Sequence, residues 1–155
     1  DFHGVNYYTR STVTGFADGV RKNSPRNDLG WEIYPDGLPQ VAEKLEKLLK
    51  RPIWVTENGT CDNQDSFRAR YIYEHLKAMF RSGLPFERYS HWCFCDNFEW
   101  LEGESARFGL INVDYATQTR TIKRSGEFYA DMIRNDGVTD EAYNTYVRGE
   151  VYRIE

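Results

Sequence analysis

The stretch that decides the fold of this chain is Pro52-Ile53-Trp54-Val55-Thr56-Glu57-Asn58-Gly59. Residues that favour a β-strand run directly into a carboxylate, and an Asn-Gly turn follows. Helix-like segments stand on both sides of this strand, which is the pattern of a parallel α/β sheet. Chemistry in such sheets gathers at the carboxyl ends of the strands, so Glu57 is a candidate catalytic residue. The competing interpretation is a loop glutamate with its charge in water.

The composition indicates a globular protein of ordinary size. The chain has 155 residues, of which 40% are hydrophobic, 28% charged and 15% aromatic. A net charge of −4 argues against nucleic-acid binding through phosphate neutralisation. No apolar run approaches ~18 residues, so we expect no membrane span. Three cysteines, an odd number, argue against a disulfide framework and predict a cytoplasmic location.

Two further strand–helix pairs surround the central strand. We predict strands at 2–9, 53–56 and 89–94, and helices over 37–50, from Asp65 or Ser66 to Gly83, and from Ser125 to Gly137. Residues 10–36 are predicted to be a long loop, residues 107–115 a short extended piece, and 138–155 receive no assignment. Three consecutive units predict an open parallel sheet with two bare edges. No Gly-rich phosphate fingerprint follows any strand, so no nucleotide cofactor is expected.

Four linked motifs resemble one known family. Val55-Thr56-Glu57-Asn58-Gly59 resembles the strand-seven nucleophile motif of family 1 glycoside hydrolases, which are retaining β-glucosidases, β-galactosidases and relatives on (β/α)8 barrels. In the family's order, residues 4–9 resemble its strand six, 31–38 its lead into helix six, and 91–110 its strand-eight region. The resemblance therefore implies an α/β fold made of the last three βα units, strands 6–8, of a TIM barrel. Residues 1–155 would be a C-terminal part of the barrel, with 138–155 as a tail of uncertain structure.

The resemblance implies roles at the nucleophile. Glu57 would be the carboxylate that forms the glycosyl-enzyme intermediate. Asn6 and Tyr8 would flank and orient it, and Tyr8 would donate its phenol to the carboxylate. Retaining hydrolysis also needs a second carboxyl group, as acid/base, ~5–5.5 Å away. The family places that group in an Asn-Glu-Pro segment, which this chain lacks.

The same resemblance implies a sugar subsite. Trp92 would be the platform under the ring, Glu99 and Trp100 would read the outer hydroxyls, and Phe108 would close the pocket wall. A carboxylate accepts two hydroxyl protons and a Trp face covers the C–H side of a sugar. Glu99 would repel a 6-phosphate and so favours unphosphorylated substrates. Glu104 stands where an aromatic residue is expected, which puts the adjoining wall in doubt.

The aromatic residues and the cysteines also have simpler interpretations. Tyr8, Trp92 and Phe108 are what a plain barrel core would contain. The cysteines and His91 could suggest a metal, but their spacing is not that of a zinc site, so we favour buried free thiols and expect no metal or other cofactor.

The predicted function is retaining hydrolysis of β-glucosides or β-galactosides by the full-length enzyme, the isolated chain being inactive. The alternatives are a non-catalytic sugar-binding module and a self-assembling barrel fragment. Expected partners are the β-linked glycoside and either a second copy or the missing N-terminal part of the barrel. Association would cover apolar barrel-facing side chains, for which Val5, Val55 and the Cys93–Cys95 pair are the candidates.

Overall fold

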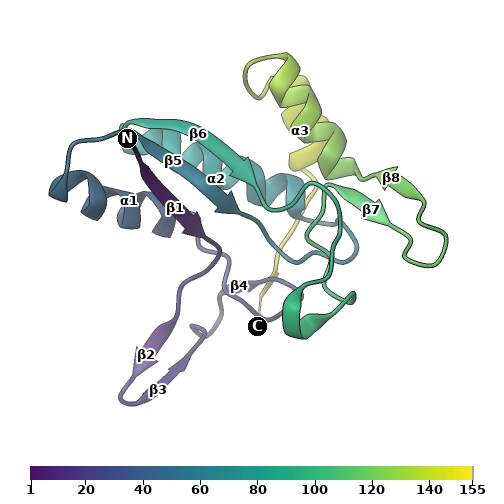
Figure 1. Ribbon diagram of the computed structural model, residues 1–155, viewed down its shortest axis with the longest axis horizontal. Helices are drawn as coiled ribbons and strands as arrows, with labels where there is room; N and C mark the ends of the chain where they lie inside the picture. The colour runs from purple at the N-terminus through teal and green to yellow at the C-terminus, as the bar shows by residue number, and fades with distance from the viewer. Residues whose placement is uncertain (155) are drawn as a thin grey trace.

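A three-stranded parallel sheet forms the centre of the computed structural model, which describes residues 1–154. The strands β1 (His3–Tyr7), β5 (Ile53–Asn58) and β6 (Phe86–His91) lie in the order β1-β5-β6. The helices α1 (Gly37–Leu48) and α2 (Arg68–Ser82) lie behind this sheet in Figure 1. The three predicted strands in parallel order, joined through helices, are therefore confirmed.

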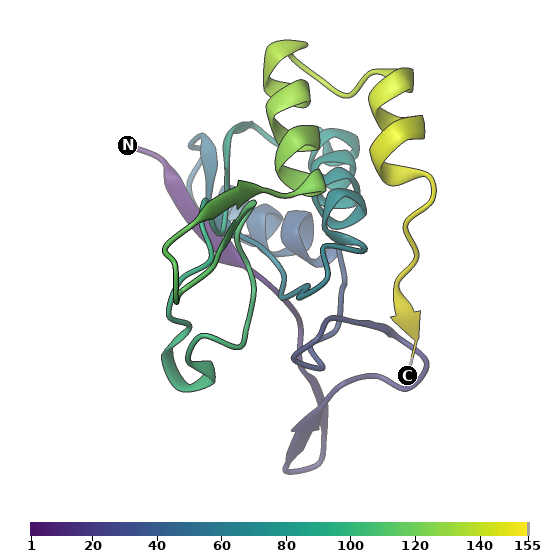
Figure 2. The same ribbon diagram turned by 90° about the vertical axis from the view of Figure 1, so that its right-hand side faces the viewer.

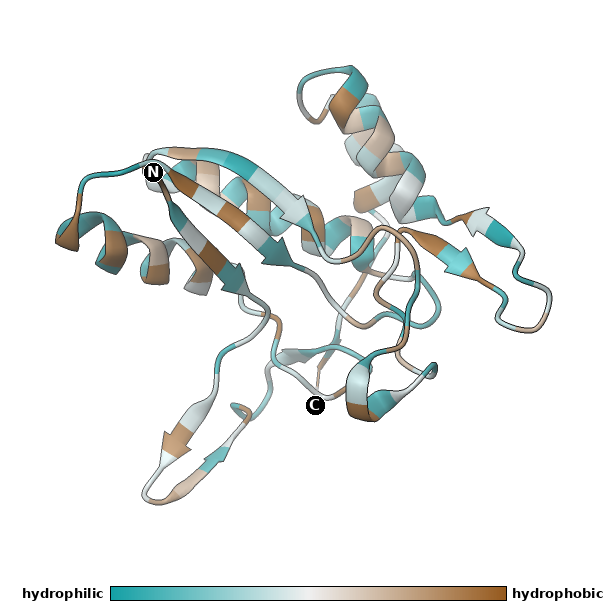
Figure 3. Ribbon diagram, viewed as in Figure 1, coloured by the Kyte–Doolittle hydropathy of each residue, from teal (hydrophilic) through white to brown (hydrophobic). Residues whose placement is uncertain are grey.

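The core lies between the sheet and these two helices. Val5, Tyr7, Ile53 and Val55 are buried and pack against apolar residues of α1 and α2, namely Leu38, Ala42 and Met79. Side chains of a strand alternate between its faces, so Asn6 and Thr56 occupy the opposite face and are exposed. The alternation of apolar and polar residues along the strands is visible in Figure 3.

The prediction that Val5 and Val55 face a barrel interior was therefore wrong. Two amphipathic helices need a continuous apolar layer beneath them, and these valines supply it. Cys93 and Cys95 do not share that open face either, because they follow the end of β6. Cys93 is buried in a separate cluster around Phe108.

The third strand lies three residues earlier than predicted. It spans Phe86–His91 rather than 89–94. Pro85 already accepts a hydrogen bond from the Ile53 amide at 2.9 Å, which starts the pairing with β5. Beyond Trp92 the chain leaves β5, and Cys93 exchanges backbone hydrogen bonds with Phe108 and Leu110 instead.

The predicted loop over 10–36 contains regular structure. A hairpin of β2 (Thr12–Thr14) and β3 (Ala17–Gly19) projects away from the sheet in Figure 1. Gly15, with φ of 64°, lies between these strands. The short strand β4 (Pro25–Arg26) follows, and Asn27 then accepts hydrogen bonds from the amides of Leu29 and Trp31 to close a turn.

The helix caps come from residues other than those predicted. The carboxylate of Asp62, rather than Asp65 or Ser66, accepts hydrogen bonds from the first amides of α2, which are those of Ser66, Phe67 and Arg68. Asp65 instead accepts from the amide of Ser125 at 2.9 Å, near the start of α3 (Arg124–Arg134). Ser125 is thus a donor and not the cap of its own helix. The predicted end of α2 at Gly83 is confirmed, with φ of 65°.

Residues 138–154, for which the sequence predicted no structure, lie on the outside of α2 and α3. After the hairpin of β7 (Ile111–Val113) and β8 (Arg120–Ile122), α3 leads to the short α4 (Asp140–Ala142) and the π-helical turn η2 (Tyr143–Val147). Figure 2 shows this C-terminal helical segment beside α2 and α3, with β9 (Arg153–Ile154) running down to β4. Within residues 1–154 we find no helix long and apolar enough to cross a membrane.

Candidate active site

Glu57 and Tyr8 meet at the carboxyl end of the sheet. Tyr8 follows β1, and its hydroxyl donates a hydrogen bond of 2.7 Å to Oε2 of Glu57 in β5. Burial, and then this hydrogen bond, raises the pKa of the Tyr8 phenol well above its ordinary value of 10. The phenol therefore keeps its proton at neutral pH and acts as a fixed donor to a half-buried carboxylate.

Asn6 lies opposite Glu57 in the pairing of β1 with β5. Its side-chain oxygen accepts a hydrogen bond of 2.6 Å from the Thr56 hydroxyl on the open face of the sheet. The backbone of Asn6 thus flanks Glu57 while its side chain contacts Thr56, and its role in orienting the nucleophile stays a prediction.

Asn58, next to Glu57, is a buried connector that the sequence indicated only as a turn residue. Its amide nitrogen donates to the Tyr7 carbonyl at 2.7 Å and to the Tyr71 hydroxyl at 3.0 Å. Its side-chain oxygen accepts from the Tyr89 hydroxyl at 2.8 Å. One side chain thereby joins all three strands to α2 directly beneath the carboxylate.

Gly59 allows Trp92 to lie close to the end of β5. A Cβ at position 59 would meet the Trp92 carbonyl oxygen at 1.8 Å. The Trp92 amide in turn donates to the Asn58 carbonyl at 2.8 Å. The glycine of the Asn-Gly turn is therefore a requirement of this close approach, and it brings the predicted sugar platform next to the strand of Glu57.

An aromatic cluster supports Tyr8 from behind. Phe108 is 2% exposed and lies edge-on to Tyr8, with ring centres 6.4 Å apart. The ring centre of Trp31 is 6.3 Å from that of Tyr8 and 6.0 Å from that of Phe108. Phe108, predicted as a pocket wall, is thus a buried supporting residue in this chain. The sequence did not indicate Trp31 as a site residue. Trp31 lies in the segment 31–38, and no sequence pattern predicts that this segment contacts Tyr8.

Glu99 and Trp100 follow β6 in an irregular segment. Glu99 is half-buried, and its charge is one of the lesser causes that raise the pKa of Tyr8. Trp100 begins the 3-10 turn η1 (Trp100–Glu102), has φ of 43° and is 80% exposed. The structure leaves the Trp100 ring in solvent, and the roles of Glu99 and Trp100 at a sugar stay predictions.

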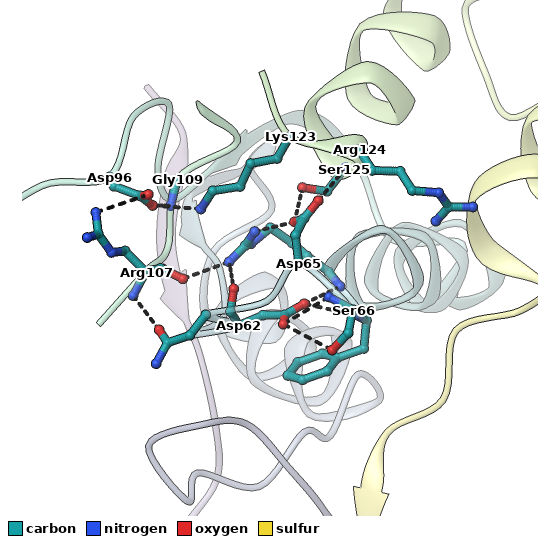
Figure 4. Close-up of polar contacts among 12 residues, drawn as sticks. Asp62, Asp65, Ser66, Asp96, Arg107, Gly109, Lys123, Arg124 and Ser125 are labelled. Carbon is teal, nitrogen blue, oxygen red and sulfur yellow. Dashed lines mark hydrogen bonds and ion pairs between the residues drawn. The ribbon is translucent and has the colours of Figure 1, made fainter. Parts of the chain in front are cut away.

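A buried polar network fixes the loops around these residues, as Figure 4 shows. Arg68 is fully buried, pairs with Asp65, and donates to the carbonyls of Asp62 and Arg107, each at 2.7 Å. Asp96 accepts from the Lys123 ammonium and the Gly109 amide, each at 2.8 Å. Because these charges are buried and paired, losing one partner would leave an uncompensated charge in the interior.

The cysteines are free thiols. Burial raises the pKa of Cys93 to about 12 and that of Cys61 to about 11, so both stay protonated at neutral pH. Across residues 1–154 no group of three His, Cys, Asp or Glu side chains could hold a metal ion.

Together, the carboxylate–phenol pair of Glu57 and Tyr8, with the Trp92 backbone beside it at the carboxyl ends of parallel strands, marks a candidate active site on an α/β sheet. The sequence profile of glycosyl hydrolase family 1 matches residues 1–138, and the chain belongs to this family. The β-galactosidase of Sulfolobus acidocaldarius is 36% identical over 91% of this chain and 33% of its own length. Beta-glucosidase A of Thermotoga maritima is 34% identical over 90% of this chain and 36% of its own length.

Solved structures give the same result. The hyperthermophilic β-glucosidase from Pyrococcus furiosus superposes with a TM-score of 0.82 at 29% identity, over 96% of this chain and 36% of that chain. The family 1 β-glucosidase from Thermotoga maritima superposes with a TM-score of 0.80 at 33% identity, over 90% of this chain and 36% of that one. The chain thus spans about a third of the length of the relatives it matches.

Proposed function

We propose that this chain carries the nucleophile side of a retaining β-glycosidase site, and that its strands β1, β5 and β6 are strands 6–8 of the family barrel. The observation that carries the proposal is the 2.7 Å hydrogen bond from Tyr8 to Glu57 at the carboxyl end of the sheet. A nucleophilic carboxylate must be ionised and held in line with the anomeric carbon. A phenol that keeps its proton supports both requirements, because it donates to one carboxylate oxygen and leaves the other free to attack.

The substrates would be unphosphorylated β-glucosides or β-galactosides. In this proposal Trp92 is the platform under the sugar ring, Glu99 accepts hydrogen bonds from its outer hydroxyls, and the Trp100 indole N–H donates to one of them. The negative charge of Glu99 opposes a 6-phosphate at that end of the sugar. Several relatives named as β-glucosidases and β-galactosidases support this class of substrate.

The acid/base carboxyl group would come from the part of the barrel that this chain does not cover. Glu32 is buried, and its two carboxylate oxygens accept hydrogen bonds from the Arg10 guanidinium at 2.8 and 3.0 Å. Glu104 is exposed on the loop beyond η1. Glu32 is thus engaged by Arg10 and Glu104 lies in solvent, so neither is our candidate for the general acid.

The proposal is tested by covalent labelling. The chain is refolded together with the portion of the Thermotoga maritima β-glucosidase that it does not cover, and is treated with 2,4-dinitrophenyl 2-deoxy-2-fluoro-β-glucoside. Dinitrophenolate leaves without protonation, so the label reports the nucleophile alone. We expect a glycosyl adduct on the peptide that contains Glu57, no adduct with Glu57→Gln, and slower labelling with Glu99→Gln.

The positive control is the relative's own C-terminal segment, refolded in the same way. An adduct on another carboxylate, or equal labelling of the Glu57→Gln variant, would overturn the assignment. So would the absence of any adduct when the control segment is labelled.

A further inference from the structure

The residues beyond the family match form a strap across the outside of the molecule. The profile of the family ends at residue 138, and we define residues 139–154 as the C-terminal strap. Its helical part buries Ala142 and Val147 against Ile72 of α2 and Phe128 of α3. Its last residues pair with β4, where Arg153 lies opposite Arg26. The strap therefore reaches from the helices to the long loop that precedes α1 (Figure 2).

Glu150 attaches the middle of the strap to the beginnings of two helices. It is 6% exposed, and Oε2 accepts a hydrogen bond of 2.7 Å from the amide of Arg70 in the first turn of α2. Oε1 accepts a bond of 3.1 Å from the guanidinium of Arg124, the first residue of α3. The Arg70 guanidinium also donates to the Glu150 carbonyl at 2.9 Å. A buried carboxylate at a helix N-terminus satisfies an amide that has no partner within the helix.

The end of the strap attaches to the loop before α1. The Arg153 guanidinium forms an ion pair of 3.0 Å with Oδ1 of Asp28. The other oxygen of Asp28 accepts a hydrogen bond of 2.7 Å from the Asn63 amide. Tyr152, between the two attachment points, donates to Glu74 of α2 at 2.8 Å and lies edge-on to Phe67.

These attachments reach both loops that border the Glu57–Tyr8 pair. The loop that contains Asp28 also carries Trp31, whose ring packs against Tyr8. The loop over 59–67 follows β5, and Asn63 within it accepts a hydrogen bond of 2.9 Å from the Arg107 amide. Asp28 thus joins the strap, the Trp31 loop and the loop after Glu57 at one point.

We propose that the C-terminal strap is a clamp for the active site, and that Glu150 and Arg153 are positioning residues that act through the loops 25–33 and 59–67. The clamp fixes the position of the Trp31 ring against Tyr8, and it fixes the path of the loop 59–67 that follows Glu57. The inference rests on the proposed function only for the role of Glu57, because the contacts between strap and loops exist whatever the site does.

Hydrogen exchange on the chain itself tests the clamp. In Glu150→Ala we expect the amides of 59–68 to exchange at least tenfold faster, because a buried cap is lost. In Arg153→Ala, where the ion pair is partly exposed, we expect a two- to fivefold increase in 25–33. Glu150→Gln keeps an acceptor for the Arg70 amide and should restore most of the protection. Arg148→Ala is the matched control, because Arg148 is exposed and, among residues 1–154, its side chain bonds to Asn144 in the same turn and to neither loop.

The exchange of two other regions makes the result decisive. The hairpin β2–β3 and the hairpin β7–β8 should keep their rates in the Arg153 variant, since Arg153 pairs with Asp28 and Arg26, which lie outside both hairpins. If the strap's own amides exchange faster while 25–33 and 59–68 do not, the clamp is refuted. If Glu150→Ala unfolds the chain, Arg153→Ala still decides, because it removes only an exposed contact.

A second measurement connects the clamp with the site. In the refolded barrel used for labelling, Arg153→Ala should lower the maximal rate of labelling several-fold and leave the half-saturating concentration of the glycoside unchanged. An unchanged rate together with faster loop exchange would refute the positioning role. If wild type is never labelled, the proposed function fails, while the exchange experiment still reports on the clamp.

Discussion

Replacing Gly59 by alanine tests the contact between the end of β5 and Trp92. A Cβ at this position would lie 1.8 Å from the Trp92 carbonyl oxygen, 2.8 Å from its carbonyl carbon and 3.2 Å from its Cβ. The first two are backbone atoms, so no flexible side chain can move aside. A carbon and an oxygen in ordinary contact are about 3.3 Å apart. The two chain segments must therefore separate by about 1.5 Å.

The cost of this separation follows from two contributions. Inserting a methyl group into a packed site costs about 1–3 kcal/mol. The separation also stretches the 2.8 Å hydrogen bond from the Trp92 amide to the Asn58 carbonyl, which contributes about 1 kcal/mol. We therefore expect Gly59→Ala to lower the free energy of unfolding by about 2–4 kcal/mol. For a chain of this length that corresponds to a decrease in Tm of roughly 5–15 °C.

The assay is urea denaturation followed by tryptophan fluorescence and far-UV circular dichroism on the same samples. Gly19→Ala is the control, since a Cβ there meets nothing within 4 Å. It should change stability by less than about 0.5 kcal/mol. Equal midpoints for the two variants would refute the reasoning, because they would mean that Trp92 does not lie against Gly59.

Three further substitutions follow from the same contacts. Asn58→Ala should destabilise the chain by about 3 kcal/mol in urea denaturation, because it leaves two buried tyrosine hydroxyls and a carbonyl without their partner. Tyr8→Phe should slow the labelling of Glu57 by ten- to a hundredfold in the refolded barrel while circular dichroism is unchanged; an unaltered rate would exclude a role for the phenol. Burial raises the pKa of Glu150 to about 7, since it outweighs the hydrogen bond and the charge of Arg124 that lower it. The folded chain thus holds this proton more tightly than the unfolded one. The resulting gain in stability is complete below pH 4.5, the ordinary pKa of Glu, and is lost as the pH rises to about 7. At ~1.36 kcal/mol for each pH unit its upper limit is about 3 kcal/mol. Denaturation midpoints of Glu150→Gln should lack this component, and an identical pH profile for both proteins would contradict it.

The features that the sequence predicted correctly are set by local chemistry. The strand that leads to Glu57, the helix α1 that begins at Gly37 and the glycine that ends α2 each depend on residues within a few positions of one another. The face of a strand is different, because alternation shows which side chains share a face and not which face meets the helices. Val5 and Val55 were placed on the wrong side for that reason.

Contacts between distant residues account for the other errors. Asp65 stands where a cap of α2 would stand, yet it binds Ser125, which is sixty positions away. The carboxylates of Asp62 and Glu150 accept the hydrogen bonds from the first amides of α2 instead. No spacing rule links these residues, since each cap depends on loops that only tertiary structure brings together. The same limit hid Trp31, whose contact with Tyr8 spans two separate segments.

The open face of the sheet is the side opposite α1 and α2, and its side chains determine which surfaces can pack against it. Val5 and Val55 do not lie on this face. Its apolar surface is a stack in which the ring centres of Phe2 and Trp54 are 3.6 Å apart, and the Arg88 guanidinium carbon lies 4.0 Å from the centre of the same indole. Trp54 also donates to Glu87 at 3.1 Å, so the stack is bordered by charges of both signs. Such a face gains little from burial against a purely apolar surface, because Arg88 and Glu87 would lose their hydration. It suits strands that bring their own polar side chains and that pair with the free edges of β1 and β6. We therefore expect those two edges and the aromatic stack, rather than the valines, to be what other strands of a barrel would cover.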